Sequence, residues 1–459
     1  MNGFPSAGVR RAAMSPMDPR KRMAHLLRRA GFGVAPRELD RRLAVGFERT
    51  VHELLEFEGD DGLAEVDRLV GGILDFNAID DVRTWWVYRM VHTRRPLVEK
   101  MAFFWHGHFA TAVGKVGNAQ WMAQQNQIFR EHGLGRFGDL LQRVARDPAM
   151  LSYLDGSSNR KAHPNENFAR EVMELFTTGL GPYSEKDVQE GARAFTGWQV
   201  KDGTFAFNAG EHDDGSKTFL GRTGRFDGSD ILRILSEHPV TGQRICQKLF
   251  AFYAYDDPAP KALQPLVQAW SDSGGSIREV LRALFLSEAF SSAKAWRAKI
   301  KSPAEYVIGT IRALGGTVTP RAMGPLMARM GQDLFNPPSV KGWDGGRAWI
   351  STSSLFERFN FAAAVTGQRG PEGTSHVDPE SIFEGVQPTS IDDVLERTVT
   401  HLLDGEVPPE GRAALRAYLE VPDDPKAKPA PFAFDHRFVD GKLRGLLHLV
   451  LSTPEYQLS

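Results

Sequence analysis

Two histidines stand two residues apart in the segment FFWHGHFATAVGKV, residues 103–116. On a continuous α-helix, His106 and His108 would point about 200° apart and could not share one ion. A break at Gly107 would let both imidazoles turn toward one site, and neutral imidazole is a good ligand for zinc, iron, copper or nickel. The alternative is that both rings pack among their aromatic neighbours with satisfied hydrogen bonds. The pattern therefore makes His106 and His108 candidate metal ligands.

The segment PNENFAREVMELFTTGLG, residues 164–181, predicts an amphipathic helix with a charged face. At about 100° per residue, its apolar residues share one side of the helical wheel and its charged residues the other. Three carboxylates and one guanidinium on that polar side are candidate catalytic groups, with two amides as substrate-binding groups: Glu166, Arg170, Glu171 and Glu174, and Asn165 and Asn167.

Two interpretations of this face stay open. Glu166, Arg170 and Glu174 are spaced i, i+4, i+8, and such a ladder of ion pairs is typical of a solvated helix surface. The functional interpretation is the wall of a polar cleft. Glu171 is the carboxylate that Arg170 is least well placed to neutralise, so it would be the general base or a metal ligand.

Two further segments carry chemistry-bearing side chains. His212 and Asp213 lie in the Gly-flanked segment EHDDGSKTFLG, and a His–Asp pair can bind a metal or shuttle protons. The spacing is not that of an EF-hand, because no Glu falls at the twelfth position counted from Asp213. Trp343 and Trp349 flank a Gly-rich loop, where an indole ring could stack on a sugar or another planar ligand. Structural loops without a ligand are the alternative in both cases.

Several widespread signatures are missing from the sequence. There is no G-x-G-x-x-G motif after a strand, no Walker lysine loop, no G-x-S-x-G elbow and no H-E-x-x-H. No nucleotide cofactor is therefore expected, and a divalent metal is the cofactor that the histidines would suit. The single cysteine, Cys246, excludes an intramolecular disulfide and a thiolate cluster.

The bulk composition excludes further classes of function. The chain has 459 residues, 56 Lys plus Arg against 57 Asp plus Glu, and a net charge of −1. This balance gives no overall field for nucleic acid, so no nucleic-acid partner is expected. No apolar stretch reaches the length of about 18 residues that a membrane span needs.

Through most of the chain the apolar residues recur with the period of an α-helix, so helices must position these side chains. We expect helices over 19–30, 36–45, 48–58, 81–92, 96–104, 119–132, 137–146, 167–178, 184–195, 230–237, 241–253, 276–287, 303–314 and 354–365. Thr204–Phe207 and Thr218–Leu220 could pair as a small ribbon. The fold class is then mainly α, a multi-helical single body with a minor β-ribbon. We expect a disordered start at 1–15, a helical main domain at 16–369 and a C-terminal helical extension packed on it at 370–459.

The N-terminal residues bear on whether the protein is cytoplasmic or exported. Arg10 and Arg11 resemble part of a twin-arginine export signal, but Met14 to Arg22 is polar and charged where an apolar segment should follow. The sequence as given therefore predicts a cytoplasmic protein.

Several of these segments together resemble the large bacterial family of unknown function numbered eighteen hundred. The resemblance rests, in chain order, on HLLRRAGFG (25–33), FWHGHFATAVGKV, RDPAMLSYLDG (146–156), the long segment from Pro164 to Trp198, HDDGSKTFLGRTGRFDG (212–228), KSPAEYV (301–307) and MGQDLFNPPSVKGWDGG. It implies no established activity and no catalytic residue. It implies that members are often encoded beside an exported, alkaline-phosphatase-like family and are often exported themselves, so a periplasmic location is the alternative.

Two functions fit the sequence. The first is a metal-assisted or acid–base enzyme, hydrolase-like, in which the histidine, acidic-helix and His–Asp segments converge on one polar cleft lined by His and Glu. The second is a non-catalytic helical binding or assembly partner, for example of a neighbouring gene product. The concentration of His, Asp, Glu and Asn in separate segments favours the enzyme.

Overall fold

Helices account for most of this computed structural model, which describes residues 17–57, 59, 61–70, 72–316, 321–367, 376–421 and 431–459. The first half of the chain forms α1 (Pro19–Arg29), α2 (Pro36–Val45), α3 (Phe47–Leu55), α4 (Leu63–Val70), α5 (Ile79–His92), α6 (Pro96–His108), α7 (Val113–Val116), α8 (Ala119–His132), α9 (Phe137–Ala145), α10 (Pro148–Tyr153), α11 (Glu166–Glu171) and α12 (Glu185–Ala194). The second half forms α13 (Gly228–Glu237), α14 (Pro239–Tyr253), α15 (Pro260–Ser273), α16 (Ile277–Leu286), α17 (Pro303–Ala313), α18 (Met323–Arg329), α19 (Thr352–Thr366), α20 (Ile391–Leu403), α21 (Pro409–Glu420), α22 (His436–Phe438) and α23 (Arg444–Leu451).

Local sequence signals explain where many of these helices begin. Ser184 and Asp187 form the capping box that starts α12, and Ser302 and Glu305 do the same for α17, where Pro303 occupies the first helical position. The predicted ranges agree with the observed helices within a few residues. α4, α7, α10, α15 and α18 were not predicted, and α20 to α23 lie in the C-terminal extension that was predicted to be helical without separate ranges.

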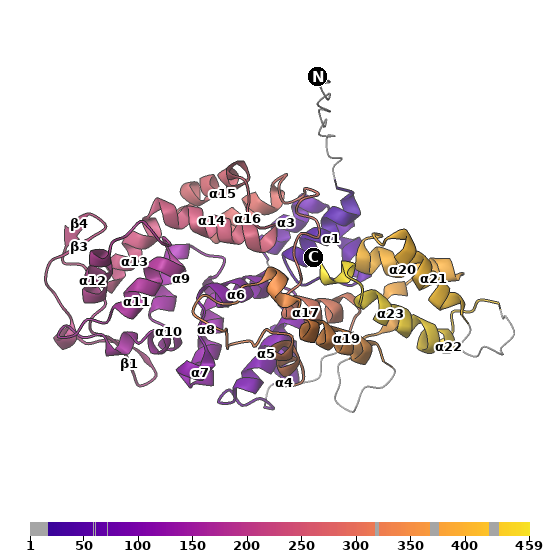
Figure 1. Ribbon diagram of the computed structural model, residues 1–459, viewed down its shortest axis with the longest axis horizontal. Coiled ribbons are helices and arrows are strands. Elements are labelled where there is room, and N and C mark those ends of the chain that lie inside the picture. The colour runs from indigo at the N-terminus through magenta and orange to yellow at the C-terminus, as the bar shows by residue number, and fades with distance from the viewer. Residues whose placement is uncertain are drawn as a thin grey trace, which may run out of the picture.

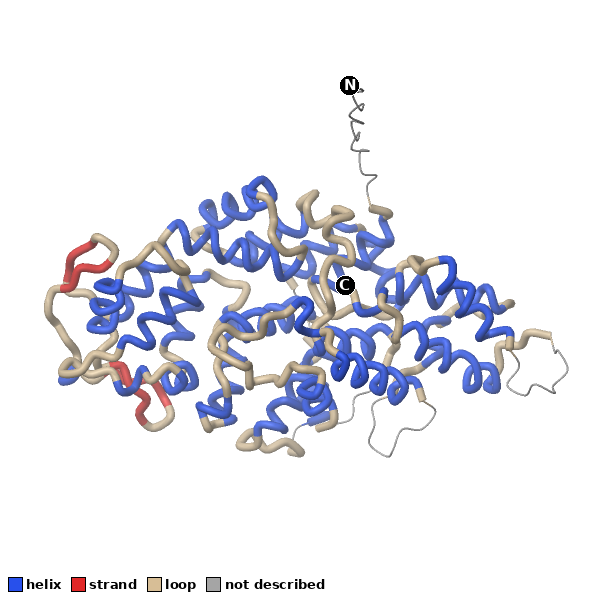
Figure 2. Tube along the Cα trace, in the orientation of Figure 1, coloured by secondary structure: helices blue, strands red, loops and turns tan. Residues whose placement is uncertain are grey.

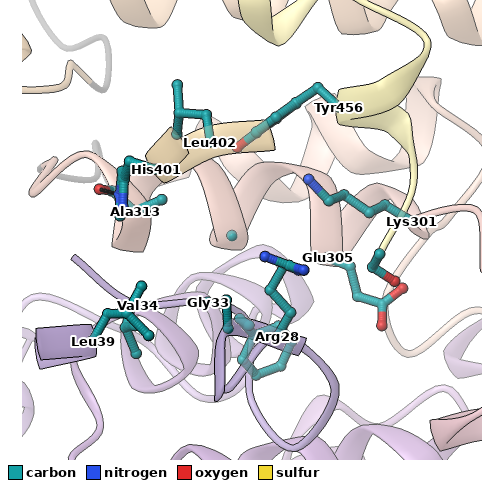
Figure 3. A pocket seen from close by; sticks show the side chains of 14 residues that line it. Arg28, Gly33, Val34, Leu39, Lys301, Glu305, Ala313, His401, Leu402 and Tyr456 are labelled. Carbon is teal, nitrogen blue, oxygen red and sulfur yellow. Dashed lines mark hydrogen bonds between the residues drawn. The ribbon is translucent and has the colours of Figure 1, made fainter. Parts of the chain in front are cut away.

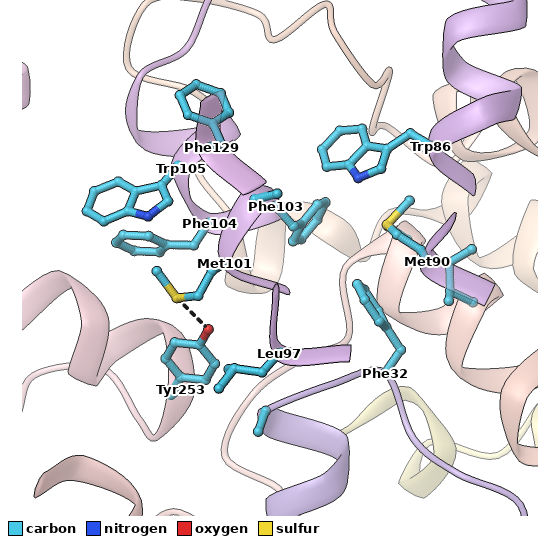
Figure 4. Close-up of a cluster of buried hydrophobic side chains, with 14 of the residues drawn as sticks. Phe32, Trp86, Met90, Leu97, Met101, Phe103, Phe104, Trp105, Phe129 and Tyr253 are labelled. Carbon is cyan, nitrogen blue, oxygen red and sulfur yellow. Dashed lines mark hydrogen bonds between the residues drawn. The ribbon is translucent and has the colours of Figure 1, made fainter. Parts of the chain in front are cut away.

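The helix α6 lies at the centre of the molecule (Figure 1). The helices α14, α15 and α16 run along one side of it, α9 to α13 lie at one end of the molecule, and α19 to α23 lie at the other. Large side chains of α6 pack on all sides, among them Met101, Phe103, Phe104 and Trp105 (Figure 4). The Tyr253 hydroxyl on α14 donates a hydrogen bond to the Met101 sulfur at 2.9 Å. These contacts fix α6 against α14, and the two helices carry the site described below.

The strands form two separate hairpins near the α12 end of the molecule (Figure 2). β1 (Trp198–Lys201) pairs antiparallel with β2 (Thr204–Phe207), and β3 (Lys217–Phe219) pairs antiparallel with β4 (Arg222–Gly224). The predicted ribbon between 204–207 and 218–220 is therefore wrong. Each strand instead pairs across a two-residue turn in which both residues have positive φ, 51° and 76° at Asp202–Gly203 and 45° and 75° at Leu220–Gly221. Such turns match the right-handed twist of the strands that they join.

The prediction of a mainly α protein with a minor β component is confirmed, and one continuous hydrophobic core joins the helices. Residues 1–15, and the expected boundary between residues 369 and 370, lie outside the described residues, so the division at 370 stays a prediction. α23 packs against α19, and Arg28 of α1 forms an ion pair with Asp404 at the end of α20. No described helix is both long enough and apolar enough to cross a membrane.

Candidate active site

A cavity of about 480 Å³ lies between α6, α14 and the loop 341–349. One part of its lining is aromatic: Phe103, Phe104, Phe252, Trp343 and Trp349. The rest carries titratable and amide groups: His108, Lys248, Asp256, Lys299, Glu305, Gln332, Lys341 and Asp344. Apolar walls with a few convergent polar groups are the usual composition of a small-molecule site.

The hydrogen bonds of His108 fix its tautomer. Its Nε2 lies 3.1 Å from the carbonyl oxygen of Phe176, which can only accept, so Nε2 carries the proton. Its Nδ1 lies 3.0 Å from Nζ of Lys248 and therefore accepts from that amine. Burial lowers the pKa of His108 well below its usual range, and the neighbouring Lys248 lowers it further. The ring is thus a neutral acceptor that orients the lysine.

Lys248 is the amine that could do chemistry in this cavity. Burial lowers its pKa to about 8, with a further contribution from the guanidinium of Arg244, one helical turn earlier on α14. A neutral lysine can donate one N–H to His108 and keep its lone pair for a bound molecule. Amines with lowered pKa serve as general bases and nucleophiles in enzymes.

A close glycine contact seats the loop 341–349 on α6. Gly342 has φ of 81°, and a Cβ at this position would lie 2.4 Å from the carbonyl oxygen of Gly107. Only glycine permits this approach without a shift of the loop. The next residue, Trp343, packs on His106 with ring centroids 5.4 Å apart. This contact places the Trp343 ring in the cavity wall.

The acidic helix meets the cavity at its edge. α11 continues into a π-helical turn, Val172–Phe176, whose last carbonyl is the one that anchors His108. Burial raises the pKa of Glu171, as does the charge of Glu174, while the Lys341 ammonium lowers it. Burial lowers the pKa of Arg244, and the charge of Glu174 raises it. The Arg244 guanidinium contacts the carbonyl oxygen of Leu175 at 3.4 Å. Glu171 and Glu174 therefore lie beside the cationic groups of the site without lining the cavity.

A family model described as "Protein of unknown function (DUF1800)" matches residues 25–458. The chain belongs to this family. The match confirms the family predicted from the sequence segments and extends over the tail beyond Gly370. No curated protein and no solved structure matches the chain.

In this DUF1800 chain, the predicted metal ligands are not brought together. No three His, Cys, Asp or Glu side chains in the described ranges are placed to hold a metal ion. α6 continues through Gly107 to His108, so the two imidazoles point to different sides. His106 is buried and its Nε2 accepts a hydrogen bond from the amide of Phe335, and burial lowers its pKa to about 3. His106 thus follows the alternative interpretation, an imidazole packed among aromatic rings.

The His–Asp segment lies away from the cavity and is held by structural contacts. Nδ1 of His212 lies 2.9 Å from the carbonyl oxygen of Thr196. Asp213 receives two hydrogen bonds from Arg193, at 2.7 and 3.1 Å, and the guanidinium lowers the pKa of that carboxyl. Asp213 is therefore already neutralised.

Of the remaining predicted residues, some make structural contacts and others line the cavity. Arg170 forms ion pairs with Glu166 at 3.0 Å and with Glu185 at 2.7 Å, and Glu166 is half-buried while Glu185 is exposed. Asn165 caps α11, and the Asn167 amide donates to the carbonyl oxygen of Leu154 at 3.2 Å. Trp343 and Trp349 both line the cavity.

Lys248 and Arg244 were not predicted from the sequence as functional residues. Both lie in a segment correctly predicted as helical, where they read as ordinary polar positions. A signal was present, because Lys248 stands among Cys246, Leu249 and Phe250 on a largely apolar helix. What buries Lys248 is distant in the chain: His108 on α6.

Proposed function

We propose that the protein is an acid–base enzyme, hydrolase-like, that acts on a small molecule bound in the cavity between α6, α14 and the loop 341–349. The single observation that carries this proposal is the contact between Nζ of Lys248 and Nδ1 of His108, 3.0 Å long and partly buried in the cavity wall. Lys248 is the general base. It takes a proton from water or from a substrate hydroxyl while His108 holds it in place.

The surrounding groups support this role. No carboxylate pairs with Lys248 in the described residues, and Arg244 adds a like charge, so both burial and electrostatics favour the neutral amine. Trp343 and Phe104 line the cavity, and aromatic side chains of this kind suit a planar or sugar-like ligand. Lys341, beside Glu171, adds a positive charge at the rim that would attract an anionic substituent.

The proposal is tested first by the reactivity of the amine. The intact protein is acylated briefly with acetic anhydride at a series of pH values, and modification of each lysine is quantified by mass spectrometry. Lys248 should reach half of its maximal rate near pH 8, and Lys261, an exposed lysine on α15, is the reference for the extent of modification. A Lys248 profile that rises only near pH 10 would contradict the proposal.

A substrate screen then tests catalysis itself. Wild-type protein is assayed on chromogenic esters, glycosides and phosphate esters, together with Lys248→Met and the control Lys261→Met. Loss of a general base lowers the rate by about 10²- to 10⁴-fold, so an activity at this site should fall by that factor in K248M alone. An activity that survives in K248M would not come from this cavity.

The second candidate function, a non-catalytic protein-binding partner, is favoured by one observation. On α19, Phe356 has 63% of its surface exposed and Phe359 has 39%. Aromatic side chains of this kind are enriched at protein interfaces. This function predicts that the product of a neighbouring gene co-purifies with wild-type protein and that Phe356→Ser abolishes the complex. Retention of the complex in F356S would exclude this face.

A further inference from the structure

Two sequence segments that the proposed function leaves unused meet in a second cavity. Residues 25–33, at the end of α1, and residues 301–307, at the start of α17, face each other across it, and Tyr456 and His401 close it from the C-terminal part (Figure 3). The cavity has a volume of about 50 Å³. A small ion fits in this volume, because a cavity of about 10–15 Å³ already holds one water molecule.

The charged side-chain groups that face this cavity are mainly cationic. Arg28 and Lys301 both extend into it, from α1 and from the segment that precedes α17 (Figure 3). Lys301 is only 7% exposed, and its Nζ lies 3.5 Å from the centre of the Tyr456 ring. Within the described ranges, no carboxylate or carbonyl oxygen accepts a hydrogen bond from this ammonium. Lys301 is therefore a buried amine without a counter-ion of its own.

The two nearby side-chain carboxylates, Asp404 and Glu305, are paired with other cations. Asp404 receives two hydrogen bonds from Arg28, at 2.9 and 2.7 Å, and also lies 3.6 Å from Arg297. Glu305 is paired with the buried Lys100 at 2.5 Å. Burial lowers the pKa of Lys301 well below its usual range, and Arg28, Arg297 and Arg358 lower it further. An anion bound beside Lys301 would oppose these effects and stabilise the protonated amine, because water screens charges little in this place.

We propose that this cavity binds a small inorganic anion, held by Lys301 and Arg28. A buried charge is tolerated when it is paired, and an anion here would supply the partner that the protein does not provide for Lys301. The site is distinct from the cavity that holds Lys248, so this proposal does not depend on the proposed function.

The test is the thermal stability of the full chain in different sodium salts at equal ionic strength. Chloride, bromide and phosphate are each titrated against gluconate, which is too large for the cavity. A ligand that binds only the folded state raises the melting temperature with a saturable concentration dependence. We expect such a rise for chloride and bromide, and for phosphate as well if the cavity takes an oxyanion. Equal melting temperatures in all four salts would overturn the proposal.

Two variants localise the effect. Lys301→Met should abolish the anion-dependent rise, whereas Lys299→Met should keep it, because Lys299 is two residues away but pairs with Asp256 and lines the other cavity. A rise of equal size in K301M would overturn the proposal. A readout independent of the variants is an anomalous diffraction peak from bromide beside Lys301 in wild-type crystals, and bromide elsewhere only would count as contradiction.

Discussion

Nζ of Lys248 lies 3.0 Å from Nδ1 of His108, and Nε2 of the same ring lies 3.1 Å from the carbonyl oxygen of Phe176. The imidazole therefore links α14 to the π-helical turn that follows α11. Because the carbonyl fixes the proton on Nε2, the lysine meets an acceptor in every state in which the ring is neutral. This relationship leads to the first of four predictions.

Lys248→Met should stabilise the protein below about pH 8, and the gain should shrink as the pH rises. The folded-state pKa of Lys248 is about 8, against an ordinary 10.5, so the unfolded chain binds more protons between these values. Stability of the wild type therefore rises with pH across that window. The shift corresponds to a gain of at most about 3 kcal/mol at pH 7. Urea unfolding at pH 7 and pH 10 measures it, with Lys261→Met as the control. A gain that is equal at both pH values would disagree with a lowered pKa.

Gly342→Ala should destabilise the loop that forms the cavity wall far more than Gly346→Ala. Both glycines have positive φ, 81° and 54°, so each substitution costs about 1 kcal/mol for the backbone alone. Only at Gly342 would the new Cβ also meet the carbonyl oxygen of Gly107, at 2.4 Å, while nothing lies within 4 Å at Gly346. The additional overpacking costs about 1–3 kcal/mol. Denaturant unfolding of the two variants measures the difference, and equal losses would show that the loop is not seated on α6.

The effect of Asp147→Asn on the free energy of unfolding should change sign with pH. Burial raises the pKa of Asp147 to about 7 from an ordinary 3.8, so the folded state binds more protons between these values, and the wild type loses stability as the pH rises through them. Asn cannot ionise, and its oxygen can still accept from the Gln125 side chain and the Met150 amide. Its amide nitrogen, however, replaces an oxygen that has no hydrogen-bond partner among the described residues, at a cost of about 1–3 kcal/mol.

The variant should therefore be less stable than wild type at pH 4 and more stable at pH 8, by roughly 1–3 kcal/mol. Unfolding at the two pH values measures this crossover. Asp227→Asn is the matched control, because Asp227 also caps a helix but is only half-buried. A D147N variant that is less stable than wild type at both pH values would contradict the raised pKa.

Glu99→Gln should be among the most destabilising polar substitutions in the chain. Glu99 is buried on α6 and accepts from Arg89 at 3.2 Å, from Arg130 at 2.7 and 3.0 Å, and from the Trp86 indole at 3.0 Å. Removing its charge leaves two guanidinium groups buried with reduced compensation, which costs about 3–5 kcal/mol.

Glu166→Gln is the comparison for this prediction, because it weakens a partly exposed surface ion pair with Arg170, worth about 0–1 kcal/mol. Thermal unfolding of both variants should show a large fall in the melting temperature for E99Q and almost none for E166Q. Similar falls would mean that the buried network adds nothing beyond a surface pair.

Much of the fold follows from local sequence signals. The range 119–132 predicted for α8 coincides with the observed helix, where Asn118 caps the first turn. Hydrophobic periodicity and capping act within a few residues, so they are visible in the sequence. The π-helical turn after α11 is not visible in the sequence, because i→i+5 hydrogen bonds do not change the spacing of apolar residues that reveals an α-helix.

The site was less predictable than the fold, for a physical reason. His108, Trp343 and Trp349 were recognised by residue type, and the structure places all three in one cavity. The role proposed for Lys248 depends on its contact with His108, which precedes it by 140 residues in the chain. Likewise, Arg193 already neutralises Asp213, and no spacing within residues 211–221 reveals that partner. Residue type shows which side chains could act, whereas tertiary packing decides which of them are left unpaired.

The carboxylate of Glu305 lies in the wall of both cavities, with Lys100 as its ion-pair partner. The two cavities thus share this acidic residue in their lining. A charged ligand in one cavity would alter the potential at that side chain and so the affinity of the other cavity for its own ligand. Thermodynamic reciprocity requires the two changes in affinity to be equal, whichever ligand arrives first.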